Sequence, residues 1–449
     1  MRLHILGICG TFMAGIALIA KEMGIQVSGS DQAIYPPMSD ILKNAGIEIF
    51  EGWHKKQLEQ KIDCVIVGNA LSRGNEAVEY LLNQKIPYQS GPAWLYENVL
   101  KNRHVIAVTG THGKTSTTAL ITWILETAGL TPGFLIGGAP KNFKTSARLG
   151  SAPFFVIEGD EYDTAFFDKA SKFLHYHPDT LILNNCEFDH ADIFENIDAI
   201  KKQFKNLIRI IPSSGKIIYS REDKNLKNIL KEVWTPMEST GIQSGDWKAR
   251  NVEKSGAQFD LYFKKKLFAH MEWSQCGLHQ VQNAVNAVAA AHSVGVAKKD
   301  IVQAFKTFEG VKRRLEISGV ANQITVYDDF AHHPTAIAAN VSALKEKIKP
   351  ARLIAVLQCG TNTLKSGFYD AEIIEALQQS DYAFILSDKK NYASLHAKKT
   401  ASKTSLEIFS QADLLLKRLL KIIKSKDHVL LMSNKTFDGL HGKLLDKLK

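Results

Sequence analysis

The sequence lacks the features that hold a chain in a membrane or link it by disulfides. No apolar run in its 449 residues approaches the roughly 20 residues needed to cross a bilayer, and the strand-like Leu3-His4-Ile5-Leu6 stands where a secretory signal would lie. The five cysteines (Cys9, Cys64, Cys186, Cys276 and Cys359) have no paired spacing, so neither a disulfide framework nor a zinc site is indicated. We therefore expect a cytoplasmic protein with buried thiols and no membrane partner.

The chain also lacks the combined aromatic and basic motifs of nucleic-acid-binding modules. Its formal net charge is +10, but much of the excess lies in helix-like segments such as residues 417–426, where a solvated surface is the common explanation. Anionic small substrates suffice as partners, and we expect no nucleic acid. With 45% apolar and 23% charged residues, the composition is that of a globular protein, and the length favours two or three domains.

A strand, a glycine-bounded turn and a helix are predicted for residues 105–128. Val105 to Thr109 is strand-like, Gly110-Thr111-His112-Gly113 forms the turn, and Lys114-Thr115-Ser116 opens a helix that should stop at Gly129. Glycine allows the positive φ angles of a tight turn, so backbone N–H groups can converge there on phosphate oxygens. Lys114 would then bridge the β- and γ-phosphates of a nucleotide, and the Thr115 hydroxyl would hold Mg²⁺.

Two more strand-like runs end in carboxylates and a histidine. Phe154 to Ile157 leads to Glu158-Gly159-Asp160-Glu161, and Leu181 to Leu183 leads to a polar run that closes at His190. Ligands of parallel sheets gather at the carboxyl ends of the strands, so both runs should face the phosphate turn. Glu158 is the best Mg²⁺ ligand candidate, and His190 is placed to reach a second metal. A solvated acidic loop and an ordinary histidine are the alternatives.

Residues 1–103 are interpreted as an α/β nucleotide-binding unit. The strand at 3–6 is followed by a turn containing Gly7 and Gly10, an apolar helix through Met23, and a second strand that ends at Asp31, where a Rossmann fold offers a carboxylate to a ribose. The glycines do not reproduce G-x-G-x-x-G, so a packing turn fits this pattern as well as a ligand site. A further strand at 64–67 precedes Ser72-Arg73-Gly74-Asn75.

Short strands and turns are expected from 217 to 268, and an alanine-rich helix begins at Gly277. His279 and Asn283 lie four residues apart on one face of this helix. Arg314 ends a cationic run where a third domain begins; it could reach phosphate across a cleft, although a solvated run is the ordinary explanation. The strand at 324–327 ends at Asp328, and Pro334 is suited to start the next helix.

The motifs together resemble those of the Mur ligase family, amide-forming enzymes of cell-wall precursor synthesis. The resemblance rests on Gly110 to Thr115, Glu158 to Asp163, Asn185 to His190 and Asp328 to Thr335, which occur in the family's order. Tyr35-Pro36-Pro37-Met38-Ser39 and Thr361-Asn362-Thr363-Leu364-Lys365-Ser366-Gly367 are similar to the subgroup that adds a murein peptide. That subgroup usually carries Arg where Gly360 stands, which leaves part of the peptide or phosphate contact open.

The resemblance implies an α/β protein of three domains. Residues 1–103 would form a Rossmann-like UDP-sugar-binding domain, 104–312 a central ATP-binding domain with a P-loop ATPase-type parallel sheet, and 313–449 a Rossmann-like peptide-binding domain. The implied activity is ATP-dependent ligation of L-alanyl-γ-D-glutamyl-meso-diaminopimelate to UDP-N-acetylmuramate through an acyl phosphate, in peptidoglycan recycling. The alternatives are a ligase that adds L-alanine and a nucleotide-gated binding protein without catalysis.

The resemblance also implies roles for individual residues. Lys114, Glu158, His190 and His333 are expected to be catalytic, and Thr115, Glu158 and His190 to hold Mg²⁺. ATP is expected to contact Gly110, Thr111, His112, Gly113, Lys114, Thr115, Ser116, His279, Asn283, Arg314 and Asp328. UDP-N-acetylmuramate and the tripeptide are expected to contact Gly7, Cys9, Gly10, Thr11, Asp31, Ser72, Arg73, Asn362 and Lys365. Some family members carry a carbamylated lysine; Lys201, Lys202 and Lys205 are available here, and none is favoured.

Overall fold

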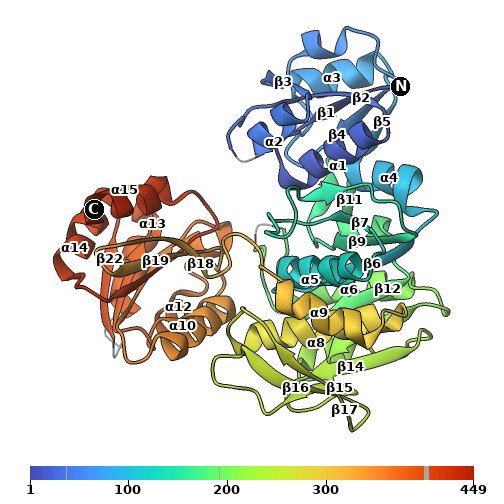
Figure 1. Ribbon diagram of the computed structural model, residues 1–449. Coiled ribbons are helices and arrows are strands. Elements are labelled where there is room, and N and C mark those ends of the chain that lie inside the picture. Colours follow the sequence, from blue (N-terminus) through green and yellow to red (C-terminus); the bar gives the residue numbers. More distant parts are fainter. Residues whose placement is uncertain (37, 192, 399–403) are drawn as a thin grey trace.

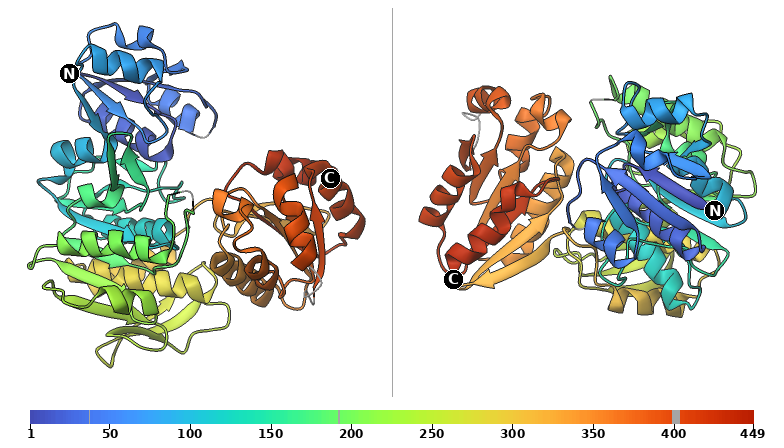
Figure 2. Two further views of the ribbon diagram at one scale, coloured as in Figure 1. Left: turned by 180° about the vertical axis from the view of Figure 1, so that it is seen from behind. Right: turned by 90° about the horizontal axis from the view of Figure 1, so that it is seen from above.

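Three large β-sheets, each with its own helices, organise the described part of the chain (Figure 1). The computed structural model describes residues 1–36, 38–191, 193–398 and 404–449. The N-terminal domain is stacked on one end of the central domain, and the C-terminal domain lies beside the central domain (Figure 2). The predicted α/β class with three domains is confirmed. Among the described residues, no helix has the length and apolarity needed to span a membrane.

The N-terminal domain is a parallel sheet in the order β3-β2-β1-β4-β5. Its strands are β1 (Arg2–Leu6), β2 (Gln26–Asp31), β3 (Glu48–Glu51), β4 (Cys64–Val67) and β5 (Tyr88–Ser90), and its helices are α1 (Thr11–Glu22), α2 (Met38–Asn44), α3 (Glu76–Asn83) and α4 (Gly91–Leu95). The predicted strand, turn and apolar helix at the N-terminus are thus present. Within the Tyr35 to Ser39 motif, Pro37 lies outside the described residues, and Met38 begins α2.

The central domain holds a ten-stranded sheet in the order β17-β16-β15-β14-β13-β12-β6-β9-β7-β8. Pairing is parallel from β15 to β7 and antiparallel at both edges. Its strands are β6 (His104–Thr109), β7 (Gly133–Leu135), β8 (Ala147–Arg148), β9 (Phe154–Glu158), β12 (Thr180–Leu183), β13 (Lys216–Ser220), β14 (Met237–Gly241), β15 (Trp247–Arg250), β16 (Gln258–Phe263) and β17 (Lys266–Glu272). The central sheet is therefore mixed at its edges and parallel where the candidate site lies.

The helices of the central domain are α5 (Lys114–Thr127), α6 (Ile197–Arg209), α7 (Lys224–Ile229), α8 (Leu278–Ser293) and α9 (Lys298–Thr307), and β10 (Asp163–Ala165) with β11 (Asp168–Ser171) form a separate hairpin. Helix α5 stops as predicted, with Gly129 in a left-handed conformation just after its cap. The expectation of only strands and turns from 217 to 268 missed α7, which Asp223 caps by accepting the Leu226 N–H.

The C-terminal domain has six strands in the order β18-β19-β23-β20-β21-β22, parallel except for the β18–β19 pair. The strands are β18 (Glu316–Ala321), β19 (Ile324–Asp329), β20 (Leu353–Gln358), β21 (Tyr382–Leu386), β22 (Ser405–Phe409) and β23 (His428–Met432). The helices are α10 (Pro334–Ile348), α11 (Asn362–Lys365), α12 (Asp370–Ala376), α13 (Lys389–Lys398), α14 (Ala412–Ile422) and α15 (Leu440–Leu448). Pro334 does start α10, with His333 as its cap.

The distribution of apolar cores distinguishes the domains. One buried cluster runs from Leu3 and Ile16 in the N-terminal domain to Leu135 and Phe155 in the central domain, so these two domains share a core. At this junction α1 approaches β7 closely, because a Cβ at Gly15 would lie only 3.0 Å from the Leu135 side chain. The C-terminal domain packs its sheet between two clusters of its own. The hydrogen bonds described below join it to the central domain.

Candidate active site at the carboxyl edge of the central sheet

The turn between β6 and α5 is a tight glycine turn. Gly110 and Gly113 have φ angles of +128° and +77°, which favour glycine. Neighbours enforce the same choice, since a Cβ at Gly113 would lie 2.3 Å from the Asn283 side-chain oxygen. The His112 N–H donates to Asn185 Oδ1 at 2.8 Å, and Ser116 lies buried in the first turn of α5. The predicted strand, glycine turn and helix are present, and Asn283 lies against the turn as its expected role requires.

Lys114 lies at the centre of the site. Its Nζ is 3.0 Å from Glu161 Oε2 and 2.7 Å from the Gly110 carbonyl oxygen. Burial lowers the pKa of Lys114, but the carboxylates of Glu161, Asp160 and Glu158 outweigh it and raise the pKa above its ordinary value. Lys114 is therefore a charged ammonium held in place, the form needed to contact phosphate oxygens.

Thr115 and Glu158, the two oxygen ligands expected for Mg²⁺, are in direct contact. The Thr115 hydroxyl donates to Glu158 Oε1 at 3.1 Å, and the Gly137 N–H donates to Glu158 Oε2 at 2.8 Å. Burial raises the pKa of Glu158 despite the nearby Lys114, so the positive charge of Lys114 does not fully offset the cost of burying the ionised carboxylate. A hydroxyl and an undercompensated carboxylate are hard oxygen donors, which fit a magnesium ion.

Arg314 extends from the start of the C-terminal domain to the same place. Its Nη2 lies 3.4 Å from Thr115 Oγ1, and its guanidinium lies 5.3 Å from the ring centroid of Phe330. The structure therefore brings this residue to the phosphate turn, as the sequence suggested, rather than to solvent.

His190 pairs with Glu161 rather than with Glu158. Its Nε2 is 3.0 Å from Glu161 Oε1, and ligand atoms of Asp160, Glu161 and His190 lie within 4.8 Å of one another. Burial lowers the pKa of His190, yet Glu161 and Asp189 raise it above the ordinary value overall. Burial raises the pKa of Asp160, but Lys172, at 2.8 Å, and Lys114 lower it to about 2.

Glu161 was missing from the predicted site although it lies in the acidic run that the sequence singled out. It is 2% exposed and contacts both Lys114 and His190. Burial raises its pKa, but Lys114 and His190 lower it below the ordinary value. The available signal was its position three residues after the end of β9, which does not by itself tell which carboxylate turns inward.

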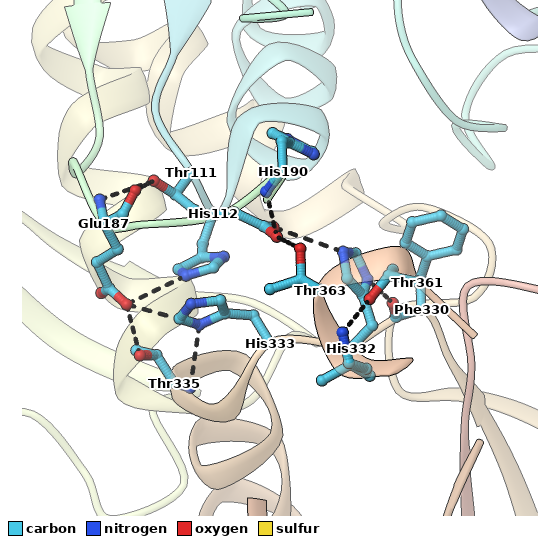
Figure 3. A network of polar contacts seen from close by, with 12 residues as sticks. Thr111, His112, Glu187, His190, Phe330, His332, His333, Thr335, Thr361 and Thr363 are labelled. Atoms are coloured by element: carbon cyan, nitrogen blue, oxygen red, sulfur yellow. Dashed lines mark hydrogen bonds and ion pairs between the residues drawn. The ribbon is translucent and has the colours of Figure 1, made fainter. Parts of the chain in front are cut away.

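The loop after β12 is held by the C-terminal domain (Figure 3). Thr335 donates its hydroxyl to Glu187 Oε2 at 2.6 Å, and Tyr369 donates to the Phe188 carbonyl oxygen at 2.6 Å. The Thr363 hydroxyl accepts from the Ala191 N–H at 3.2 Å and lies 3.3 Å from Asp189 Oδ1. These contacts dock the third domain next to His190.

His333 also contacts this loop. Its Nε2 lies 3.2 Å from the Phe188 carbonyl oxygen, and its ring centroid is 4.4 Å from that of His112. Burial, with a smaller effect of His112, lowers the pKa of His333 to about 4, so the ring is neutral at neutral pH. The sequence analysis expected a catalytic role for His333 but missed its partners Glu187 and Thr335.

His279 begins α8 beside the same turn. The residue is half-buried, its buried Nδ1 has no hydrogen-bond partner among the described residues, and burial followed by the charges of Arg314 and His112 lowers its pKa to about 4. An unpartnered buried ring nitrogen is suited to a ligand with a complementary polar edge.

Asp328 lies apart from these groups. It is paired with Arg313 at 3.2 Å and with His441 at 3.1 Å, both within the C-terminal domain. Arg313 and His441 therefore hold the carboxylate of Asp328 in place, and its contact with ATP stays a prediction. Asp329, its neighbour, instead accepts N–H groups from Leu315 and Ala331.

The predicted sugar-binding residues divide into two groups. Gly7 opens the turn after β1, Gly10 caps α1, Thr11 starts it, and the Cys9 N–H donates to Asp31 Oδ2 at 2.9 Å. Asp31 also accepts the Ala33 N–H at 3.0 Å, so its carboxylate braces the turn. Ser72 and Arg73 follow β4, which pairs with β1 on the side opposite β2. Arg73 is exposed and paired with Glu79 at 2.9 Å.

An open cavity of about 660 Å³ lies at the same edge of the N-terminal sheet, beside Asp31 and Arg73. It is lined by Gln32, Glu51, Gly52, Trp53, His54, Gly74, Asn75 and Glu76. The sequence analysis missed Trp53 and His54, because they follow a strand, β3, that carried no recognised motif.

The expected peptide-contact residues are the first and last residues of the short helix α11. Asn362 is its exposed first residue, and Lys365 lies 3.7 Å from Asp388. A Cβ at Gly360 would lie 2.3 Å from Asn434 Oδ1, so a larger side chain there would require the Asn434 side chain to move. Among the candidate lysines of α6, Lys201 is paired with Asp198 at 3.2 Å.

Comparison with known proteins relates this arrangement to a family. Three family models match in chain order: the Mur ligase catalytic domain over residues 2–103, the Mur ligase middle domain over 108–291, and the Mur ligase glutamate ligase domain over 313–435.

Full-length relatives agree with the family models. The chain is 48% identical over 450 residues to UDP-N-acetylmuramate–L-alanyl-γ-D-glutamyl-meso-2,6-diaminoheptandioate ligase of Escherichia coli strain K12, covering 100% of this chain and 98% of that protein. It is 47% identical to the Haemophilus influenzae protein of the same name, covering 100% and 99%. The crystal structure of a murein peptide ligase from Psychrobacter arcticus matches with a TM-score of 0.78 at 42% identity, covering 100% and 98%. The chain therefore belongs to the Mur ligase family.

Proposed function

We propose that this chain is an ATP-dependent ligase that joins L-alanyl-γ-D-glutamyl-meso-diaminopimelate to UDP-N-acetylmuramate and so returns released wall peptide to precursor synthesis. The names of the Escherichia coli and Haemophilus influenzae relatives supply both substrates. The observation that carries the proposal is the contact set Lys114, Thr115, Glu158 and Glu161 at one sheet edge.

The proposed reaction begins with phosphoryl transfer. A carboxylate is a poor electrophile, so the lactyl carboxylate of the sugar attacks the γ-phosphorus of ATP, forming an acyl phosphate and releasing ADP. Lys114, an ammonium fixed by Glu161, offsets negative charge on the transferring group, and Arg314 approaches from the C-terminal domain. Thr115 and Glu158 would hold Mg²⁺, which supplies Lewis-acid charge neutralisation when bound.

Amide formation follows in the proposal. The α-amine of the peptide attacks the acyl carbon, the amine loses a proton, and inorganic phosphate leaves. The peptide is proposed to lie along Asn362 and Lys365, which the docked C-terminal domain carries toward the loop that holds His190. Docking also limits access of water to the acyl phosphate.

We propose matching roles for the remaining residues. The turn Gly7, Cys9, Gly10 and Thr11, braced by Asp31, would face the UDP diphosphate, and Ser72 and Arg73 would close the sugar site. His279 and Asn283 would contact the adenine, with Gly110 to Ser116 around the phosphates, and residues 1–103, 104–312 and 313–449 would be the sugar, ATP and peptide domains.

Phosphate release tests the proposal. Purified protein with ATP, Mg²⁺ and UDP-N-acetylmuramate is supplied with the tripeptide, with L-alanine, or with neither. Tripeptide-dependent release supports the proposal. Alanine-dependent release would identify an L-alanine ligase instead, and no release in any mixture would leave a nucleotide-gated binding protein.

A further inference from the structure

Two imidazoles and a carboxylate meet where the C-terminal domain touches the central domain (Figure 3). His112 comes from the phosphate turn, Glu187 from the loop after β12, and His333 from the cap of α10, and one ligand atom of each lies within 4.8 Å of the others. We propose that these three residues form a binding site for a divalent transition-metal ion, with Zn²⁺ as the best fit, that links the two domains. This site is separate from the oxygen ligands proposed for Mg²⁺.

The spacing of the donor atoms suits a metal better than direct hydrogen bonds. His112 Nε2 is 3.4 Å and His333 Nδ1 is 3.6 Å from the same oxygen, Glu187 Oε2. Charge-assisted hydrogen bonds are shorter, at about 2.7–2.9 Å. A tetrahedral zinc site with bonds of about 2.0–2.2 Å places neighbouring ligand atoms about 3.4 Å apart.

Neighbouring groups orient the three ligand residues through hydrogen bonds. His333 Nε2 is 3.2 Å from the Phe188 carbonyl oxygen, so a proton on Nε2 leaves the Nδ1 lone pair toward Glu187. Metal-bound histidines commonly donate their second ring N–H in this way. The Glu187 N–H donates to Thr111 Oγ1 at 2.8 Å, and the Thr335 hydroxyl donates to Glu187 Oε2 at 2.6 Å. A bound ion would displace the Thr335 N–H, 3.3 Å from His333 Nδ1, and would replace the 3.4 Å hydrogen bond between His112 Nε2 and Glu187 Oε2.

The ligand types determine the class of ion. Two imidazoles with one carboxylate favour Zn²⁺, Co²⁺ or Ni²⁺, whereas Mg²⁺ prefers oxygen donors and waters. The neighbouring cluster of Asp160, Glu161 and His190 offers two carboxylates and one imidazole, so it is the better site for a hard cation.

The position of the ligands couples metal binding to domain docking. Glu187 and His112 belong to the central domain and are fixed to one another through Thr111, while His333 belongs to the C-terminal domain. An ion that needs all three binds the docked arrangement more tightly than a separated one, and it therefore stabilises docking. Because substrates and products require the domains to separate, Zn²⁺ is expected to slow turnover.

Cobalt spectroscopy on the full-length protein tests the site without using the ligase reaction. Co²⁺ is added in the presence of excess Mg²⁺, the visible d–d absorption of tetrahedral Co²⁺ is recorded, and Zn²⁺ is titrated to displace it. We expect the intense tetrahedral band in the wild type, and a more than tenfold loss of Zn²⁺ affinity in His112→Gln, Glu187→Gln and His333→Gln. His332→Gln and His190→Gln serve as matched controls and should keep the band.

Circular dichroism of the metal-free variants identifies any variant that does not fold. The loss of Zn²⁺ affinity must then appear in a folded central-domain variant, His112→Gln or Glu187→Gln, and in folded His333→Gln. A wild type without the band, or equal Zn²⁺ affinity in all variants, overturns the proposal. Loss of the band in His190→Gln but not in His333→Gln also overturns it, because the ion then belongs to the neighbouring cluster. None of these results bears on tripeptide-dependent phosphate release.

Discussion

Glu161 contacts both Lys114 and His190, two largely buried cations, so Glu161→Gln is the most informative perturbation of the site. Its two oxygens lie 3.0 Å from Lys114 Nζ and 3.0 Å from His190 Nε2. The substitution keeps the size and one accepting oxygen but removes the charge. Lys114 and His190 then keep only the weaker attraction of Asp160, Glu158 and Asp189.

The expected magnitude follows from these distances. At 3.0 Å and an effective dielectric constant of about 20, each pair has a gross attraction of about 5.5 kcal/mol. Desolvation offsets much of it, and breaking a buried pair by changing one partner costs about 3–5 kcal/mol. The lower figure applies, since the amide oxygen still accepts from Lys114. A loss of about 3 kcal/mol lowers Tm by about 6–12 °C for a unit the size of the central domain.

The Tm deficit of Glu161→Gln is also expected to depend on pH, through the pKa of His190. In the wild type the pKa of His190 is raised, because Glu161 and Asp189 outweigh burial, so its protonation stabilises the fold below the ordinary pKa of 6.5. That stability is lost as pH rises through the folded-state pKa. Without Glu161, burial dominates and lowers the pKa, so the deficit in Tm should be larger at about pH 6 than at about pH 9.

Thermal unfolding at these two pH values measures the change in Tm, and NMR titration of the histidine rings measures the change in the pKa of His190. Glu158→Gln is the matched control, because Glu158 is half-buried and near Lys114 but contacts Thr115 and Gly137 rather than His190. An unchanged His190 titration in Glu161→Gln, or an equal change in both variants, would refute the reasoning.

Three further outcomes follow from the contacts of the site. Lys114→Ala should abolish phosphate release while leaving UDP-N-acetylmuramate affinity in equilibrium binding nearly unchanged; a large loss of that affinity contradicts separate sugar and ATP domains. Burial lowers the pKa of His333 to about 4, so its neutral form gives stability that is complete above about pH 6.5 and declines toward pH 4, and His333→Gln should flatten the Tm curve over that range. Tyr369→Phe removes the 2.6 Å bond to Phe188 and should lower kcat about fivefold, equivalent to about 1 kcal/mol, whereas Tyr327→Phe, inside the C-terminal sheet, should not.

Local patterns predicted the parts of the site that lie within one strand–turn–helix unit. Lys114 and Thr115 follow Gly113 at the start of α5, and Glu158 ends the neighbouring strand β9, so parallel pairing alone brings them to one edge. The Thr115–Glu158 contact was predictable because both positions depend on strand ends and not on loop conformation.

The missed residues depend on loop conformation or on domain placement. Glu161 follows Gly159 and Asp160, and only the path of that loop turns it toward Lys114 rather than toward solvent. Glu187 and Thr335 are 148 residues apart and meet only because two domains dock. The ion pairs of Asp328 with Arg313 and His441 were likewise not predictable from local patterns, because they depend on how distant segments of the C-terminal domain pack.

The docking contacts also connect the peptide domain to the phosphate-contacting lysine. Thr335, Tyr369, His333 and Thr363 bind the short segment from Glu187 to Ala191, and His190 in that segment binds Glu161, which binds Lys114. Each docking hydrogen bond contributes about 0.5–1.5 kcal/mol, so the set is worth only a few kcal/mol and can break in every catalytic cycle. Separating the first two domains would expose their shared apolar core, which costs more free energy than breaking these hydrogen bonds. The C-terminal domain is therefore expected to move during turnover. When it docks, it fixes the segment from Glu187 to Ala191, on which the orientation of Glu161 and Lys114 depends.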